Sequence, residues 1–321
     1  MSDDNTQDRA QWLEARKRYI GGSDAAAIMG LSPWSTPVEL WMEKTGRSVK
    51  ALPDAARERV FARGKKLEPI IIDMVVDKLR GQGHEVELVA KNQRYTDPEF
   101  PFMSCEIDME LRIDGELVNG DAKSVHGFAR RKWGAEDTED IPIEYAAQFM
   151  HGLMVTPGNR QRCLVAALIG LDDVAIYWLH RDEETIAAMR AKEVEFWQDC
   201  VLGGVMPDPM VFNDIKVLFP SDNGQAIEAT ADIADKVKQL AEIKARIKTW
   251  EASEEELKFE VSEFISPNAR LTFNGKELAS WKGQDDTRLD TALFKASHPA
   301  LFTEFSRTKV IRVLRLKKAS S

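Results

Sequence analysis

The spacing of apolar residues changes at residue 84, and this change constrains the fold more than any other feature of the sequence. Residues 61–83 carry apolar side chains at helical spacing and end in two glycines, which predicts an amphipathic helix. From His84 onward, residues 84–95 and 103–115 alternate between apolar and polar, and residues 116–125 form a third short run with apolar positions. A period of two is typical of strands, so we expect a helix followed by a meander of strands.

Further helices and strands follow the meander. Tyr145, Phe149 and Leu153 mark one face of a helix that ends before Pro157, residues 163–170 and 173–180 are expected as strands, and residues 181–204 as a long helix. Upstream, we expect three helices. The first covers residues 6–19, the second follows the Gly21-Gly22 break and would be capped by Ser23 or Asp24, and the third ends before Gly46. This order predicts an α+β fold with helices layered against a mixed central sheet.

Two domains are expected in 321 residues at about 150 residues per domain. The pattern dissolves into proline, glycine and polar residues around 207–224, which places the boundary near 216 and gives domains 1–215 and 216–321. The second domain should contain a helix over 230–265 with near-heptad apolar spacing, and a hairpin that turns at Asn274-Gly275. Residues 310–316 alternate apolar with basic residues and are expected as an edge strand with one cationic face.

The distribution of charge matters more than its sum. The formal net charge is -9, but residues 305–321 contain six basic residues and no acidic one, namely Arg307, Lys309, Arg312, Arg315, Lys317 and Lys318. A clustered basic segment in an acidic chain leaves nucleic acid open as a partner. The chain starts without an apolar leader segment, and nowhere are about 18 apolar residues uninterrupted by charge, so we expect a cytoplasmic protein that does not enter a membrane.

The three cysteines indicate buried thiols. Cys105, Cys163 and Cys200 are odd in number and far apart in the sequence, which fits neither a disulfide framework nor a CxxC metal site.

Two acids and a lysine carry the main chemical signal. Asp108 lies in one expected strand, and Asp121 and Lys123 lie in the next. Positions i and i+2 of a strand share a face, so Asp121 and Lys123 should converge, and a turn at Asp114-Gly115 would bring Asp108 beside them. Paired carboxylates suit a hard cation such as Mg²⁺, and the lysine would orient or deprotonate an attacking water. The alternative interpretation is that Asp108, Asp121 and Lys123 are ordinary charged residues on a strand face that is open to solvent. Glu68 and Gln148, which lie on separate helices and could join these three residues, favour a functional site.

At these residues the sequence resembles a known family, the YqaJ-like and lambda-type exonucleases of phage recombination systems, within the PD-(D/E)xK nuclease superfamily. The resemblance covers roughly residues 10–205 and rests on five blocks in order. These blocks are W-x3-R-x6-S at Trp12, Arg16 and Ser23, RGKKLEP with Glu68, the strand of Asp108, Asp121-Ala122-Lys123, and YAAQFMHGLMVT with Tyr145 and Gln148.

The resemblance implies a restriction-endonuclease-like core, two divalent cations and the cutting of duplex DNA from a 5′ end. Mg²⁺ is the expected ion, with Mn²⁺ as a substitute. The implied metal-site residues are Asp108, Asp121, Ala122 and Glu68. Lys123 would activate water, and Gln148 would position the substrate. Arg16, Ser23, Gln148 and Tyr145 would contact the DNA and its 5′-phosphate; an arginine and a hydroxyl on either side of a Gly-Gly break also suit a phosphate.

The function expected from the resemblance is a 5′-to-3′ double-strand exonuclease that leaves 3′ overhangs for a phage-type single-strand annealing protein. It also implies a homo-oligomer, a trimeric ring, in the cytoplasm of a bacterial host, with a phage or prophage origin. The alternatives are a catalytically weak DNA-end-binding or partner-recruiting module, and an endonuclease on the same fold.

The sequence departs from the family pattern at two positions. Asp121 stands where Glu is usual, and Glu106 stands where the lambda-type enzyme has a small hydroxyl residue that contacts the terminal phosphate. A carboxylate at position 106 would repel that phosphate.

Overall fold

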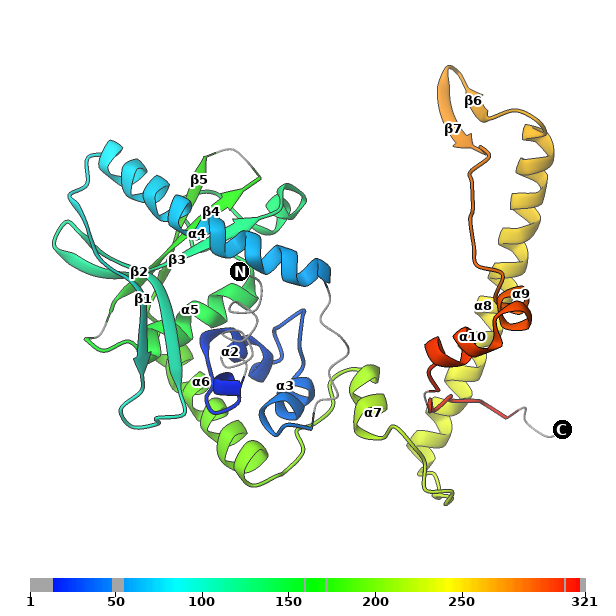
Figure 1. Ribbon diagram of the computed structural model, residues 1–321, viewed down its shortest axis with the longest axis horizontal. Helices are drawn as coiled ribbons and strands as arrows, with labels where there is room; N and C mark the ends of the chain where they lie inside the picture. The colour runs from blue at the N-terminus through cyan, green and yellow to red at the C-terminus, as the bar shows by residue number, and fades with distance from the viewer. Residues whose placement is uncertain (1–13, 48–54, 159, 171–172, 309, 318–321) are drawn as a thin grey trace. The chain divides into compact units, whose positions relative to one another are not determined.

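A computed structural model describes residues 14–47, 55–158, 160–170, 173–308 and 310–317 (Figure 1). Trp12, Lys309, Lys318 and most of the helix expected over 6–19 lie outside these residues. Contacts divide the chain into two units, residues 1–218 and residues 219–321. Among the described helices, none combines the length and the apolar run that a membrane crossing needs.

A five-stranded sheet forms the centre of the first unit. Its order is β1 (Val86–Thr96), β2 (Ser104–Ile113), β3 (Glu116–Val125), β4 (Arg162–Ile169) and β5 (Val174–His180). All neighbours are antiparallel except β3 and β4, which are parallel because the chain crosses over through α5 (Ile143–Val155). The β2–β3 turn at Asp114-Gly115 has positive φ at both residues. The mixed sheet and its helices confirm the expected α+β fold class.

Helices cover both faces of this sheet. On one face, α4 (Ala55–Gly81) packs Ile71, Ile72 and Val75 against strand residues such as Leu111 and Leu164. On the other face, α5 packs Phe149, Met150 and Leu153 against Ile107, Val165 and Tyr177, and α6 (Glu183–Glu195) adds Ile186 and Met189. Alternate residues of β4 enter the two cores, so both faces of this strand are buried. A 3₁₀ helix (Gly127–Lys132) lies between β3 and α5.

The segment before α4 is tied to the start of β2. Ile20 pairs with Met103 in an isolated bridge, and its carbonyl accepts from the Ser104 amide at 2.8 Å. This bridge holds α2 (Gly22–Ile28) and α3 (Pro37–Lys44) beside the sheet. The expected cap of α2 was wrong: Gly21 is the N-cap, and Asp24 accepts from the Gly21 amide at 3.0 Å.

The long helix expected over 181–204 begins as α6 and continues as a π-helix over Phe196–Leu202. Trp41 Nε1 donates to the Cys200 carbonyl there at 2.7 Å. Cys105 and Cys163 are buried as expected, whereas Cys200 is only half-buried. The prediction of an irregular segment around 207–224 was partly wrong, because this segment contains α7 (Phe212–Leu218). Buried Asp214 accepts from the amides of Met210 and Val211 and organises the start of this helix.

The second unit is built around one long helix, α8 (Ala231–Ile265). A hairpin follows, β6 (Arg270–Phe273) and β7 (Lys276–Ser280), and Asn274 and Gly275 take the positive φ that its turn requires. Two short helices, α9 (Thr291–Ser297) and α10 (Pro299–Phe305), come next. The edge strand expected at 310–316 was wrong: its described residues form no strand, since β6 and β7 pair only with each other.

Candidate active site

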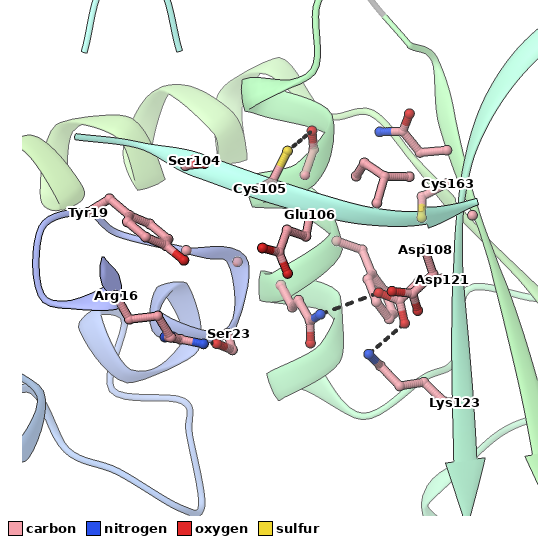
Figure 2. A pocket seen from close by; sticks show the side chains of 18 residues that line it. Arg16, Tyr19, Ser23, Ser104, Cys105, Glu106, Asp108, Asp121, Lys123 and Cys163 are labelled. Carbon is pink, nitrogen blue, oxygen red and sulfur yellow. Dashed lines mark hydrogen bonds and ion pairs between the residues drawn. The ribbon is translucent and has the colours of Figure 1, made fainter. Parts of the chain in front are cut away.

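The site lies where β2 separates from β3. The β2–β3 ladder ends at the pair Met109–Gly120, while β3 continues beside β4 as far as Val125. At the point of separation, Asp108 Oδ2 accepts from the Ala122 amide at 2.9 Å. A side-chain carboxylate thus takes the place of the backbone carbonyl that would continue the β2–β3 ladder. The two strands and α5 enclose a pocket of about 180 Å³ beyond this point (Figure 2).

Asp121 and Lys123 project from the same face of β3 into this pocket. Lys123 Nζ lies 2.5 Å from Asp121 Oδ1. The same ammonium lies 5.5 Å from the ring centroid of Tyr145 and 5.2 Å from that of Phe149, both on α5. Cation–π contacts of this kind hold an ammonium in place without neutralising it. Lys123 is therefore fixed between a carboxylate and two aromatic rings.

Gln148 reaches the acids from α5. Its Nε2 lies 3.4 Å from Asp121 Oδ2. The close packing of α2 on α5 fixes this part of the helix: a Cβ on Gly22 would lie 3.2 Å from both the Gln148 Cγ and its carbonyl oxygen. A side chain at position 22 would push Gln148 away by a few tenths of an ångström, so glycine suits this approach.

Two acids of the site, Asp121 and Glu68, have raised pKa values. The pKa of Asp121 is raised to about 7, chiefly by burial and next by the charge of Asp108, while Lys123 opposes both. Burial also raises the pKa of Glu68 on α4, and Asp108 adds to this rise. Burial lowers the pKa of Lys123, but Asp121 and Asp108 outweigh burial and the net shift is upward. Lys123 is therefore an ammonium when no cation occupies the site.

Arg16 and Ser23 line the other end of the same pocket. Arg16 Nη2 donates to Ser23 Oγ at 2.8 Å and also pairs with Asp24. Lys44 Nζ contacts the second Asp24 oxygen at 2.7 Å and donates to the carbonyls of Arg16 and Tyr19. Burial alone would raise the pKa of Asp24, but Arg16 and Lys44 hold it below its usual value. The pocket arginine is thus anchored by a buried carboxylate.

Glu106 lies between the two ends of the pocket in Figure 2, with Arg16 and Ser23 on one side and Asp108, Asp121 and Lys123 on the other. It lies two residues before Asp108 on β2 and is exposed. Arg94 is its cross-strand partner, and the Arg94 guanidinium stacks 4.1 Å from the centroid of the Tyr19 ring, another pocket residue. A carboxylate therefore stands on the path between the candidate phosphate contacts and the candidate metal ligands.

The structure brings most of the predicted residues to one pocket. Arg16, Ser23, Asp108, Asp121, Lys123 and Gln148 line it. Three more do not line it but interact with residues that do. The Tyr145 ring contacts Lys123, the Ala122 amide donates to Asp108, and the charges of Asp108 and Lys123 act on Glu68. The described residues contain no group of three or more His, Cys, Asp or Glu side chains placed to hold a metal ion, so Asp108 and Asp121 form a pair without a third acid at coordinating distance.

Sequence reasoning missed three buried polar groups around the pocket. Asn119 lies two residues before Asp121 on the same face of β3, and its buried Oδ1 has no hydrogen-bond partner among the described residues. The strand period that linked Asp121 to Lys123 would also have found it. Asp24 was predicted only as a helix cap, and it pairs with Arg16 and Lys44. Nothing in the sequence indicated that buried His151 pairs with Glu193. Both sets of contacts form only in the folded chain.

Comparison with known proteins assigns the domain. A family model, described as the YqaJ-like viral recombinase domain, matches residues 11–159, a range that contains every candidate residue above. Residues 11–159 are thus similar to that family's domain. An uncharacterized protein YqaJ of Bacillus subtilis (strain 168) is 28% identical over 325 residues, which cover 100% of this chain and 98% of that protein. The similarity therefore extends beyond the YqaJ-like domain into the second unit.

Two solved structures are more distant. An alkaline exonuclease (LHK-Exo) from Laribacter hongkongensis is 16% identical with a TM-score of 0.43, and its complex with dAMP is 17% identical with the same TM-score. Each similarity covers 60% of this chain and 93% of the other.

Proposed function

We propose that this chain is a metal-dependent 5′-to-3′ exonuclease of double-stranded DNA that leaves 3′ overhangs for phage-type recombination by strand annealing. One observation carries the proposal: a single pocket holds Asp108, Asp121, Lys123 and Gln148 at one end and the Arg16–Ser23 pair at the other. A site of this kind can bind a terminal phosphate and hydrolyse a nearby phosphodiester bond. The YqaJ-like domain supports a recombination role.

The residues present fit a divalent cation. Asp108 and Asp121 supply carboxylate oxygens, which Mg²⁺ prefers. Burial and the charge of Asp108 raise the pKa of Asp121, and a bound cation would oppose both effects. Asp108 and Asp121 would hold the ions, and Glu68, whose pKa burial and Asp108 raise, would act near them. A bound Mg²⁺ stabilises charge on a phosphate and lowers the pKa of a bound water.

The protein's own groups provide the rest of the chemistry. The Lys123 ammonium lies beside Asp121, where it orients a water for attack and holds a proton at Nζ. The Gln148 amide positions the substrate at the acids. Arg16 binds a phosphate oxygen with its guanidinium while Asp24 keeps the side chain in place, and the exposed Ser23 hydroxyl donates once more.

Digestion of two DNA forms tests this function. We expect linear duplex to shorten from its 5′ ends in Mg²⁺ and covalently closed duplex to stay intact, with neither cut in EDTA. Mn²⁺ should substitute for Mg²⁺. Opening of the closed form would indicate an endonuclease, and binding of linear DNA without shortening would indicate an end-binding module. Either result contradicts the proposal.

Metal binding can be measured without activity. Because Asp121 is a proposed ligand, Mg²⁺ should raise the thermal unfolding midpoint of the native protein and should have little effect on Asp121→Asn. An equal rise in both proteins would contradict the metal assignment.

The proposed partners are duplex DNA ends and a single-strand annealing protein, and the proposed assembly is a homo-oligomeric ring, a trimer by resemblance. A ring would surround duplex DNA and release one strand. The solution mass of the full chain in low salt tests the trimer, because rings of three give a mass that is a multiple of three chain masses.

A further inference from the structure

The helix α8 carries an apolar stripe that the described residues of its own unit leave exposed. Of the described side chains in the second unit, Ile265 alone is buried. The apolar residues of α8 repeat at positions a and d of five heptads. The a positions are Ile233, Leu240, Ile247, Glu254 and Val261, and the d positions are Lys236, Ile243, Trp250, Leu257 and Phe264. Eight of these ten positions are apolar.

Large apolar side chains in the second half of this stripe are at least half exposed. Ile247 is 50% exposed, Trp250 75%, Leu257 62% and Phe264 78%, all within one continuous helix. A single exposed apolar residue needs no explanation, whereas a continuous a/d stripe is the seam by which helices pair. The stripe spans 32 residues, or about 48 Å at 1.5 Å per residue, which is long enough for a stable coiled coil.

We propose that α8 pairs with α8 of a second copy of this chain in an antiparallel coiled coil. The charges within the stripe determine the direction. In a parallel pair in register, Lys236 would face Lys236 of the second copy, and Glu254 would face Glu254, which places two repulsions in the seam. An antiparallel pair removes both repulsions.

One antiparallel register matches the whole stripe. Ile247 then packs against Trp250 of the second copy, Leu240 against Leu257, and Ile233 against Phe264. Glu254 and Lys236 meet Ile243 and Val261, and each keeps an ion pair within its own helix, with Lys258 at 2.8 Å and Asp232 at 2.7 Å. No charge is buried without a partner.

The flanking charges select this register over its neighbours. Lys244 lies beside Glu251 of the second copy, and symmetry makes this contact twice. A shift by one heptad in one direction brings Lys244 against Lys244, and a shift in the other direction brings Glu251 against Glu251. The proposed register is the one in which opposite charges meet. The inference is independent of the nuclease chemistry, because it involves no residue of the first unit.

Mass measurement of the full-length chain by light scattering tests the pairing. We expect Ile247→Asp to halve the solution mass of the native protein. Lys244→Glu alone and Glu251→Lys alone should each weaken the association about tenfold by placing like charges together, and the two changes combined should restore it. Lys248→Glu, on the outer side of the helix, is the matched control and should leave the mass unchanged.

The outcomes separate the alternatives. If Lys244→Glu has no effect, or if the combined variant fails to recover, the antiparallel register is overturned. An unchanged mass for Ile247→Asp overturns self-association and leaves another protein as the occupant of the stripe. Far-UV circular dichroism at high protein concentration shows whether each charge variant keeps its helix, so that a loss of mass is assigned to the interface.

Discussion

The ammonium of Lys123 lies 2.5 Å from Asp121 on the same face of β3, at the strand edge that β2 leaves free. Aromatic rings of α5 border this ammonium, and Asp108 lies across the gap. The two residues are thus held as a charged pair before any substrate arrives. This geometry makes the pair the natural target for separating DNA binding from cutting.

Lys123→Ala and Asp121→Asn should abolish digestion while duplex affinity stays nearly unchanged. Loss of a proton-transfer group costs about 10²- to 10⁴-fold in rate, whereas affinity comes from phosphate contacts spread over the surface. Rates on linear duplex and binding by fluorescence anisotropy measure the two effects. Lys91→Ala removes the same charge from an exposed lysine that pairs with Asp73 at 3.7 Å, and it is the matched control. Equal loss of binding and cutting would make the pair structural.

The native enzyme should digest duplex with a 5′-phosphate faster than duplex with a 5′-hydroxyl. A charge-assisted hydrogen bond is worth about 1.5 to 3 kcal/mol, or roughly 10- to 150-fold in end engagement. Ser23→Ala should reduce the preference, and Arg16→Ala should erase it. Glu106→Ser should increase it, because Glu106 repels a phosphate in the pocket.

Thermal unfolding is the necessary control for the end-binding variants. Arg16→Ala removes one of the two cations that contact buried Asp24, so it also destabilises the fold, whereas Ser23 is exposed. Equal initial rates on the two kinds of end in the native enzyme would refute the phosphate pocket.

The buried pair of His151 and Glu193 should make stability depend on pH. His151 Nδ1 lies 3.0 Å from both Glu193 oxygens, and Nε2 donates to the Ser104 carbonyl at 3.1 Å. Burial lowers the pKa of His151, but Glu193 and this hydrogen bond outweigh burial, and nearby Asp24 adds to the rise. A raised folded-state pKa contributes stability that is complete below the unfolded value of about 6.5 and is lost as pH rises through the folded value.

Urea unfolding between about pH 6 and pH 9 measures this contribution. The double variant His151→Gln with Glu193→Gln keeps hydrogen-bonding groups but removes both charges. We expect the native protein to lose stability relative to this variant as pH rises. A constant difference between the two proteins would show that the pair does not titrate.

Removing residues 306–321 should flatten the salt dependence of DNA binding. This deletion leaves α10 intact and takes away six basic residues and no acidic one. Each lost phosphate contact lowers the slope of log affinity against log salt by roughly 0.9. Replacement of Arg312, Arg315 and Lys317 by Gln tests the charges without shortening the chain. An unchanged slope would assign the tail to a protein partner instead.

Local periodicity explains how much of this fold could be predicted. Helix α4, strands β1 to β5, helix α8 and the Asn274-Gly275 turn each follow from spacing or turn chemistry within one segment. The convergence of Asp121 and Lys123 followed from the same strand period. The prediction of a strand over residues 310–316 was wrong because alternation shows only that a segment is able to pair. A strand also needs the edge of another strand with which it can pair.

The missed parts depend on contacts between distant segments. The pairing of Arg16 with Asp24 requires the chain to turn back at Gly21 and Lys44 to arrive from α3. Helix α7 begins where Asp214 accepts from the backbone amides just before it. The same carboxylate contacts Thr36, a residue 178 positions away. No short sequence window contains both Thr36 and Asp214, or both Asp24 and Lys44.

The contact of Asp214 with Thr36 also sets where the chain can be cut. Thr36 Oγ1 donates to Asp214 Oδ1 at 2.7 Å, and Thr36 is itself the N-cap of α3, which carries Lys44 to the Asp24 carboxylate. A fragment that stopped at residue 159, where the family match ends, would lose β4, β5 and this contact together. The smallest fragment able to keep the arginine of the pocket in place therefore ends after α7, at Leu218.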